Sequence, residues 1–359
     1  MLEGKVIYVV TTGATKSKNV KNLLDDLKKN GATCIVMPTE MSCSIMDLSV
    51  LDGYRVKKDY TFNHSINEER IPEEDIVIIA PCTFNTFSKI ASGIADNYPL
   101  SIIHEAIGKG KYIVIAPSMN QGYFTHPITK ENFNKILSFG NISIVYPEFV
   151  YDDFGNLEKI TMAPWEKILD TVCHKYSKIR YQGEKIDFDM DKIIELYYPE
   201  FYKTGKYIQN NQYSNGVAGF IAKRIPEGVL ITSTGSSLGN LSREHLTLIH
   251  NWQNHFVKWS GVYMPSSETP LVLELFGEYP NSNVIVHGHC RDITYNPKMV
   301  KYTSNEYIRY GCWDELYKIK PILDVYHYAI MKLHGEIILS DTFDNALTQY
   351  FEMYNETLK

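Results

Sequence analysis

Short apolar runs alternate with segments of helical spacing in the first half of the sequence, and this rhythm constrains the fold most. The runs cover residues 5–10, 33–37, 76–80, 112–116 and 142–146. Helices are expected at residues 18–30 and near 85–95, 98–108, 128–138 and 164–176. Strands that alternate with helices form a parallel, doubly wound sheet, so an α/β, Rossmann-like domain is predicted. Ligands bind beyond the carboxyl ends of such strands, which directs attention to the loops after Val10, Ala80 and Ala116.

The second half has a different pattern. Short strands are expected, with helices between them, at residues 228–232, 284–289 and 336–340. Three histidines are expected on helical surfaces: His245, His250 and His255. The charged stretch 179–189 lacks a clear period and is interpreted as a linker. The predicted organisation is a first domain at residues 1–178 and a second α/β domain at residues 190–359.

Composition narrows the class of protein. The 359 residues carry a net charge of −6, which argues against a nucleic-acid binder with a basic face. No apolar run approaches the roughly twenty residues of a membrane helix, and the first residues lack the layout of a signal peptide. The six cysteines are scattered and contain no CxxC pair. We therefore expect a cytoplasmic protein with reduced thiols, small-molecule substrates and neither a nucleic-acid nor a membrane partner.

The loop after the first strand, residues 11–15, has the character of an anion site. Backbone N–H groups at a helix start, together with the hydroxyl groups of this Thr-Thr-Gly-Ala-Thr segment, suit a phosphate. The loop is neither a P-loop nor a GxGxxG motif, and ordinary helix capping is the alternative for each hydroxyl.

The next two loops are more specific. Residues 80–97 read APCTFNTFSKIASGIADN, and residues 116–129 read APSMNQGYFTHPIT. They resemble the Pro-x-x-x-Asn-Thr and Pro-x-Met-Asn signatures of the flavin-dependent cysteine decarboxylase family, across roughly residues 4–175. The resemblance implies FMN binding in a Rossmann-like domain, and it implies that Asn120 contacts a substrate carboxylate. The FMN-binding residues expected on this basis are Thr12, Gly13, Thr15, Thr39, Pro81, Thr83, Asn85, Thr86 and Met119.

The catalytic groups of that family are matched less completely. The resemblance implies a histidine shortly before the third strand, and His64 is the residue in that region; a solvated loop histidine is the alternative. Relatives that reduce their intermediate use a cysteine in a substrate clamp, whereas the matching residues 150–155 contain none. A tyrosine there is a weaker acid than a thiol, because its ordinary pKa is near 10. The sequence therefore predicts a flavin pocket more firmly than a complete decarboxylation.

The second half contains a metal-ligand pattern. His287 and His289 lie two residues apart on an apolar strand, so their side chains point to the same face and suit one metal ion. His334 is a third candidate, and three imidazoles leave an open coordination position, as in catalytic zinc sites. Two surface histidines on a strand are the alternative, and imidazole ligands also suit other divalent metals.

Four separated segments, within residues 190–359, resemble the class II aldolase/adducin family. They are Ser-Ser-Glu at 266–268, Thr-Ser-Thr-Gly at 232–235, Tyr-Gly at 310–311 and His-Gly at 334–335. The resemblance implies that His287, His289 and His334 bind zinc and that Glu268 is the acid/base or a transient fourth ligand. Substrate phosphate would be held by Thr234, Gly235, Ser266 and Ser267.

Two features of this half leave questions open. The family's Gly-Asn phosphate loop is replaced here by Gly219-Phe220, which weakens phosphate binding or indicates a substrate without phosphate. The family's tyrosine proton donor could be Tyr302, Tyr350 or Tyr354.

Three functional organisations follow from these patterns. In the first, an FMN-binding decarboxylase-like domain is joined to a zinc-dependent aldolase-like lyase, so that both domains are catalytic. In the second, only the aldolase-type domain is catalytic, and the flavoprotein domain is a binding or assembly module. In the third, the decarboxylase is active and the adducin-like domain is not. Because both resembled families assemble as oligomers with sites near subunit interfaces, we expect a homo-oligomer.

Overall fold

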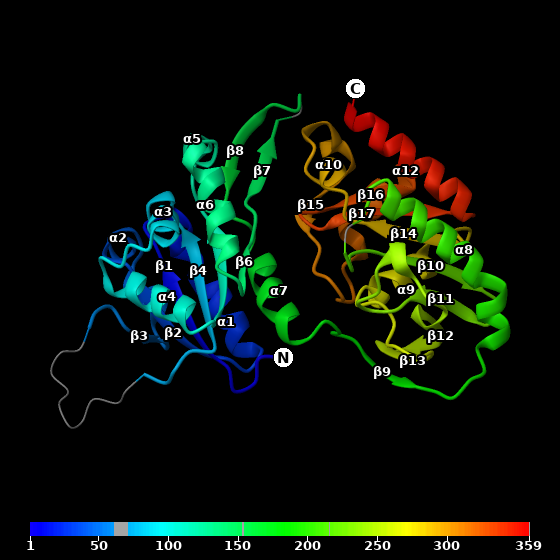
Figure 1. Ribbon diagram of the computed structural model, residues 1–359, viewed down its shortest axis with the longest axis horizontal. Helices are drawn as coiled ribbons and strands as arrows, with labels where there is room; N and C mark the ends of the chain where they lie inside the picture. The colour runs from blue at the N-terminus through cyan, green and yellow to red at the C-terminus, as the bar shows by residue number, and fades with distance from the viewer. Residues whose placement is uncertain (61–70, 153, 215, 359) are drawn as a thin grey trace. The chain divides into compact units, whose positions relative to one another are not determined.

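The computed structural model describes residues 1–60, 71–152, 154–214 and 216–358. The chain divides into two compact units, Met1–Ser177 and Lys178–Lys359, which are considered separately (Figure 1). Part of the segment expected as a linker is a strand, because β9 (Gln182–Lys185) pairs in parallel with β13 (Phe256–Ser260). The second unit therefore includes residues that the sequence pattern placed outside it.

Unit 1 contains a six-stranded parallel sheet in the order β3-β2-β1-β4-β5-β6. Its strands are β1 (Val6–Thr11), β2 (Thr33–Pro38), β3 (Arg55–Val56), β4 (Ile76–Cys82), β5 (Tyr112–Pro117) and β6 (Ile142–Ile144). The central strands β4 and β5 are buried along their whole length, which explains their continuous apolar sequence. The predicted doubly wound α/β fold is confirmed.

Helices and one hairpin complete unit 1. The longer helices are α1 (Val20–Lys29), α3 (Phe84–Ser92), α4 (Tyr98–Gly108), α6 (Pro127–Ser138) and α7 (Trp165–Tyr176). Helix α1 packs with α7, and α3 packs with α4 and α6, so two helix layers cover the sheet (Figure 1). Short helices follow β2 and β5 at α2 (Glu40–Ile45) and α5 (Gln121–Phe124), and strands β7 (Glu148–Tyr151) and β8 (Leu157–Thr161) form a separate hairpin.

Unit 2 is built on a nine-stranded, largely antiparallel sheet in the order β15-β16-β17-β14-β10-β11-β12-β13-β9. The strands not yet given are β10 (Phe220–Ile225), β11 (Gly228–Thr232), β12 (Leu246–Gln253), β14 (Val284–Gly288), β15 (Thr303–Tyr307), β16 (Tyr328–Lys332) and β17 (Gly335–Ser340). Side chains alternate along β14: Val284 and Val286 enter one core, and Ile285 enters the other. The sheet is thus apolar on both faces.

Helices cover both faces of this sheet. One core receives side chains from α8 (Asp191–Asn210), α10 (Arg291–Thr294) and α12 (Phe343–Leu358), and the other receives them from α9 (Thr269–Glu278) and α11 (Lys320–Tyr326). The predicted α/β architecture of the second half is confirmed. Among the described residues, no helix combines the length and the apolar character needed to cross a membrane.

The expectation that three histidines lie on helical surfaces is wrong in two cases. His250 is part of strand β12, and His255 lies in the turn before β13 with a φ of 62°. Only His245 lies in a short 3-10 helix, Arg243–His245. Pairing of β12 with β11 and β13 overrides the local spacing.

Candidate functional sites

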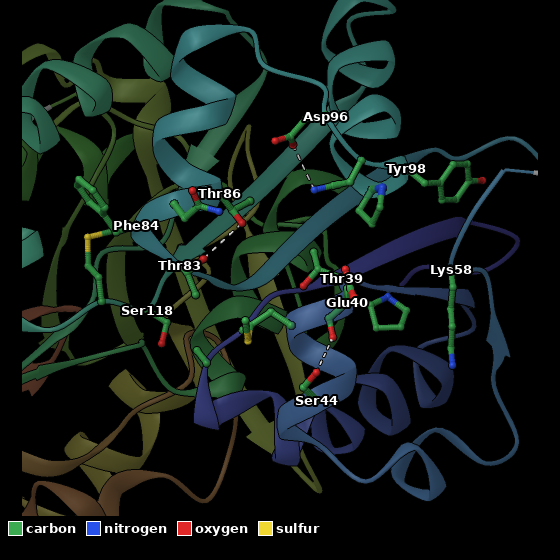
Figure 2. A pocket seen from close by; sticks show the side chains of 18 of the residues that line it. Thr39, Glu40, Ser44, Lys58, Thr83, Phe84, Thr86, Asp96, Tyr98 and Ser118 are labelled. Atoms are coloured by element: carbon green, nitrogen blue, oxygen red, sulfur yellow. Dashed lines mark hydrogen bonds between the residues drawn. The ribbon is translucent and has the colours of Figure 1, made fainter.

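Unit 1 contains a cavity of about 1040 Å³ at the carboxyl ends of its strands (Figure 2). The loops that follow β1, β2, β4 and β5 all contribute to its lining. Seven of the residues expected to contact FMN or its substrate line the cavity: Gly13, Thr39, Thr83, Asn85, Thr86, Met119 and Asn120. The size and the hydroxyl- and amide-rich lining suit a cofactor with a phosphate and a planar polar ring.

Three expected FMN-binding residues are not among those that line the cavity. Thr12 is 1% exposed, and its hydroxyl donates to Pro81 O at 2.8 Å while accepting the N–H of Thr83 at 2.9 Å. It therefore joins the end of β1 to the loop after β4. Thr15 is exposed at the start of the 3-10 helix Thr15–Asn19, and Pro81 is a buried residue of β4. These residues shape the loops that form the cavity wall.

The loop at residues 80–97 is held by its own polar side chains. Thr83 Oγ1 donates to Thr86 Oγ1 at 3.3 Å (Figure 2). Lys89 pairs with Asp96 at 2.6 Å, and Asn97 accepts the N–H of Leu100 to cap α4. These contacts hold the start of α3 and the start of α4, both of which lie at the cavity.

The loop at residues 116–129 presents an amide and an aromatic pair. Asn120 Oδ1 accepts the N–H of Tyr123 at 3.1 Å as the cap of α5, which leaves the amide nitrogen as its donor group. The rings of Phe84 and Tyr123 stack at 4.7 Å between centroids, and both residues line the cavity. Cavity-lining residues that the sequence patterns did not single out include Lys58, Tyr60 and Tyr98.

Two other features bear on catalysis in unit 1. His64 lies outside the described residues. Of the residues that match the clamp, Val150 and Tyr151 end β7, and Asp152 accepts N–H bonds from Phe154 and Asn156 before β8 begins. Hydrogen bonds from the Asn156 side chain and backbone lower the pKa of the Asp152 carboxyl. Phe154 is 90% exposed, so this hairpin carries an uncovered aromatic ring.

Unit 2 brings together His287, His289 and His334. One ring nitrogen from each lies within 4.8 Å of those of the other two, and this is the one group of at least three metal-ligating side chains within the described ranges. The ring centroids are 4.7 to 5.3 Å apart. His287 and His289 come from the end of β14, and His334 comes from the turn between the neighbouring strands β16 and β17.

The protonation of His287 is fixed by its surroundings. Its Nδ1 lies 2.8 Å from the backbone carbonyl of Glu336, which can only accept, so Nδ1 carries the proton. Nε2 is buried and has no hydrogen-bond partner among the described residues. Burial lowers the pKa of His287 to about 4, which keeps the ring neutral. The free lone pair on Nε2 suits a metal ion, because coordination would satisfy a buried polar atom that otherwise costs free energy.

Glu268 lies beside this cluster. Its Oε1 is 3.5 Å from His334 Nε2, and its Oε2 accepts the N–H of Gly311 at 3.3 Å. The side chain is 7% exposed, so the carboxylate is largely removed from bulk water. Gly311 has a φ of 63°, and a Cβ there would lie 2.7 Å from Ser267 O, which makes glycine necessary for this approach.

The expected substrate loops are hydrogen-bonded to one another. The N–H of Thr234 donates to Met264 O at 2.9 Å, and the N–H of Ser266 donates to Thr232 O at 3.1 Å. Ser266 Oγ accepts the N–H of Glu268 at 3.3 Å. The structure therefore brings together the two segments that contain Thr234, Gly235, Ser266 and Ser267.

Phe220 is directed into the core. It is fully buried, it is paired with His287 across β10 and β14, and its ring centroid lies 5.1 Å from that of His287. This residue packs against one side of the histidine cluster and offers no hydrogen bond to a substrate.

The three tyrosine candidates are distinguished by their environment. Tyr302 is 6% exposed and packs against Tyr326 and Tyr328. Tyr354 packs against Tyr213. Tyr350 is fully buried, and burial raises its pKa well above 10, so it is a poor proton donor at neutral pH.

A buried carboxyl beneath the histidines has no counterpart in the expected site. Glu336 is fully buried and accepts from Tyr350 Oη, from the N–H of Cys290 at 2.9 Å and from Thr294 Oγ1 at 2.9 Å. Burial raises its pKa to about 7. A Cβ on Gly288 would lie 1.9 Å from Tyr350 Oη, so this buried group also explains the glycine between the two histidines.

Comparisons with known families agree with this division. Residues 1–177 match the family model described as Flavoprotein, and residues 199–355 match the class II aldolase and adducin N-terminal domain. The first half of the chain is thus similar to a flavoprotein family, and the second half is similar to the class II aldolase/adducin family.

Curated relatives are similar to parts of the chain. The coenzyme A biosynthesis bifunctional protein CoaBC of Thermococcus kodakarensis is 28% identical over 191 residues, which is 52% of this chain and 45% of that protein. The phosphopantothenoylcysteine decarboxylase HAL3b of Glycine max is 35% identical over 115 residues, 31% of this chain and 51% of that protein. The chain therefore spans about half the length of these relatives.

Solved structures are also similar to parts of the chain. A PPC decarboxylase mutant complexed with pantothenoylaminoethenethiol has a TM-score of 0.42 at 22% identity, covering 48% of this chain and 98% of its own. YgbL from Klebsiella pneumoniae, a putative aldolase/epimerase/decarboxylase by its description, has a TM-score of 0.37 at 19% identity, with 48% and 89% covered.

Proposed function

We propose that this protein is a two-domain lyase. Unit 2 cleaves or forms a carbon–carbon bond in a small hydroxy-carbonyl substrate with the help of zinc or another divalent metal. Unit 1 binds FMN and is a second, decarboxylase-like site. The observation that carries the proposal is the convergence of His287, His289 and His334 beside the buried carboxylate of Glu268.

The chain's own residues define the roles in unit 2. His287, His289 and His334 would hold the metal, which supplies a Lewis acid for the substrate oxygens when bound. Glu268, held by the Gly311 N–H, would take or return a proton at the substrate carbon or hydroxyl. The hydroxyl groups of Ser266, Ser267 and Thr234 would orient the rest of the substrate. The low exposure of Glu268 and His287 would keep bulk water from the reacting atoms.

Activity measurements on matched variants test this lyase proposal. Release of aldehyde or ketone from a panel of hydroxy-carbonyl compounds should depend on added zinc and be abolished by a chelator. Glu268→Gln should lower kcat by about a hundredfold or more, since general acid–base groups contribute this much. Glu278→Gln, which alters an exposed carboxylate on α9, should leave kcat unchanged. Equal activity of the Glu268→Gln variant and the wild-type protein would exclude the assigned role.

The support for FMN in unit 1 is the agreement of motif and cavity. Seven residues expected at the flavin site line one cavity of about 1040 Å³, residues 1–177 match a flavoprotein family model, and the relatives of the chain include a phosphopantothenoylcysteine decarboxylase. The Asn120 amide would orient a substrate carboxylate. The absence of a cysteine from the clamp residues 150–155 instead favours the alternative, in which unit 1 is a binding or assembly module and only unit 2 is catalytic.

A flavin titration tests the site in unit 1. The purified protein should release FMN on denaturation, or the flavin-free protein should bind added FMN with a change in its visible spectrum. Phe84→Ala, which removes one ring of the cavity-lining stack, should weaken binding. Phe139→Ala, at the exposed end of α6 and away from the cavity lining, should leave binding unchanged. A colourless protein that fails to bind FMN would leave unit 1 as a binding or assembly module and would exclude the flavin proposal.

A further inference from the structure

Glu336 is joined to all three segments that carry the histidines of unit 2. Its backbone carbonyl accepts from His287 Nδ1 at 2.8 Å. Its side-chain Oε1 accepts the N–H of Cys290, the residue after His289, at 2.9 Å. Glu336 also lies two residues after His334, near the start of β17. One residue therefore connects the strand end and the turn from which the three imidazoles come.

The carboxylate of Glu336 lies beneath Gly288, the residue between the two strand histidines. Gly288 and Glu336 are paired across β14 and β17. A Cβ on Gly288 would lie 2.6 Å from Glu336 Oε1 and 2.7 Å from the carbonyl oxygen of Tyr213, so no side chain fits there. The backbone between His287 and His289 thus lies directly against the carboxylate, and a shift of this backbone would displace both imidazoles.

The carboxylate is itself held by two helices. Thr294 Oγ1 of α10 donates to Glu336 Oε2 at 2.9 Å, and the Tyr350 hydroxyl of α12 donates to Oε1. The Tyr350 ring stacks on that of Tyr213 with 4.3 Å between the centroids. The backbone carbonyl of Tyr213 accepts the N–H of His289 at 3.0 Å. The network of Glu336, Tyr350 and Tyr213 therefore ends on the backbone beside the strand histidines.

A role in packing alone does not account for this carboxyl group. Burial of a carboxyl group costs free energy, and an apolar side chain of similar size would fill a strand position at lower cost. Metal-binding histidines are commonly oriented by hydrogen bonds from surrounding groups, and loss of such a group typically lowers metal affinity about 10- to 100-fold. Glu336 makes the contacts expected of such a group.

We propose that the side chain of Glu336 is a positioning residue for the metal centre: it holds the backbone between His287 and His289 so that the three imidazoles converge before a metal binds. The inference rests on the metal-dependent function proposed for unit 2. Because Glu336 acts here as a hydrogen-bond acceptor, its size alone should not replace it. Glu336→Gln keeps an acceptor for the Cys290 N–H, whereas Glu336→Met fills a similar space without a comparable one.

The zinc affinity of the full-length protein is the first test, measured by competition with a chelating indicator. Glu336→Met should bind zinc about tenfold or more weakly than the wild-type protein, and Glu336→Gln should remain within about threefold. Tyr350→Phe removes one donor from the carboxylate and changes no residue of β14 or β17, so its zinc affinity should lie between these two values. It decides the question if Glu336→Met does not fold.

The visible absorption of the cobalt-loaded protein separates positioning from general destabilisation, because cobalt bands depend on the geometry of the ligands. Glu336→Met should shift these bands, and Glu336→Gln should keep the wild-type spectrum. Thr247→Val is the matched control, since it removes a buried hydroxyl on β12 that donates to Tyr263 O at 2.9 Å. It should unfold at lower urea concentration but keep the wild-type zinc affinity and cobalt spectrum.

Wild-type zinc affinity and cobalt bands in both Glu336→Met and Tyr350→Phe would overturn the inference and leave the metal site standing. Equal loss of zinc affinity in Glu336→Gln and Glu336→Met, or the same loss in Thr247→Val, would also overturn it. Failure of the wild-type protein to bind either zinc or cobalt would instead contradict the metal site, and with it both the proposed function and the inference.

Discussion

At the scale of single residues, unit 2 contains an ionisable side chain, Glu336, at a strand position that is normally apolar. Glu336 occupies a fully buried strand position and is stabilised by three hydrogen-bond donors rather than by a cation. Its backbone carbonyl also orients His287. The residue therefore links the packing beneath the sheet to the histidine cluster.

The raised pKa of Glu336 predicts a pH-dependent stability. Its ordinary pKa of 4.5 applies to the unfolded chain, and the folded value is about 7, so the folded protein retains a proton that the unfolded chain has lost. The contribution of Glu336 to the free energy of unfolding should therefore decrease by about 3 kcal/mol as pH rises from 4.5 to above 7. In urea unfolding of the metal-free proteins, the free energy of unfolding of the wild-type protein minus that of Glu336→Gln should show this decrease, because the contribution of His287, whose pKa is lowered, is common to both and cancels. Parallel pH profiles of the two proteins would contradict the assignment.

At the scale of elements, the cavity of unit 1 depends on loops that are tied to one another. The Thr12 hydroxyl bridges the end of β1 to Pro81 and Thr83 after β4. This one contact connects the first expected anion loop to the second signature loop. Thr12 therefore supports the cavity of unit 1 although its own side chain does not line that cavity.

Removal of the Thr12 hydroxyl should weaken both the fold and the cavity. Thr12→Val leaves the buried Pro81 carbonyl and the partly buried Thr83 N–H without this partner, at an expected cost of about 2 kcal/mol in the free energy of unfolding. FMN affinity should fall in parallel, because the loops after β1 and β4 separate. Thr12→Ser keeps the hydroxyl and should lose less than half as much in urea unfolding. An unchanged unfolding midpoint in Thr12→Val would show that the bridge is unimportant.

Elements with a strong periodic pattern were predictable, and elements formed by long-range pairing were not. The buried runs of β4 and β5 were identified from sequence because they are apolar throughout. Strand β9 is exposed and polar, Gln-Gly-Glu-Lys, and exists because it pairs with β13. His250 was assigned to a helix because spacing alone does not reveal the partners of β12.

The candidate sites divide in the same way. The spacing of His287 and His289 indicated a shared metal, since residues two apart on a strand face the same side. Glu336 could not be identified from the pattern, because a charged residue in an alternating strand normally faces solvent.

At the scale of the whole molecule, the boundary between units determines which fragments retain structure. Residues 178–189 contain the buried Tyr181 and strand β9, both of which contact the rest of unit 2. A fragment of residues 178–359 should therefore bind one equivalent of metal and unfold cooperatively. A fragment of residues 190–359 should unfold at lower urea concentration, because it lacks an edge strand and a core side chain. Equal unfolding midpoints would contradict this boundary.

Assembly is a separate prediction at this scale. Resemblance to two oligomer-forming families leads us to expect a homo-oligomer. Because the two domains share one chain, they must either assemble with a common closed symmetry or lose the subunit contacts typical of one of the two families. Light scattering of the full-length protein should give a mass at least twice that of the single chain. A monomeric mass at micromolar concentration would refute it.

Metal content is the most direct test of the central claim, that the three histidines of unit 2 form a catalytic metal centre. Elemental analysis of protein purified with zinc, after removal of loosely bound metal, should give about one zinc ion per chain. His289→Ala should lose most of that zinc, while His255→Ala, in the turn before β13, should retain it. Zinc-free wild-type protein, or equal zinc content in wild-type protein and His289→Ala, would contradict the metal centre and the lyase function built on it.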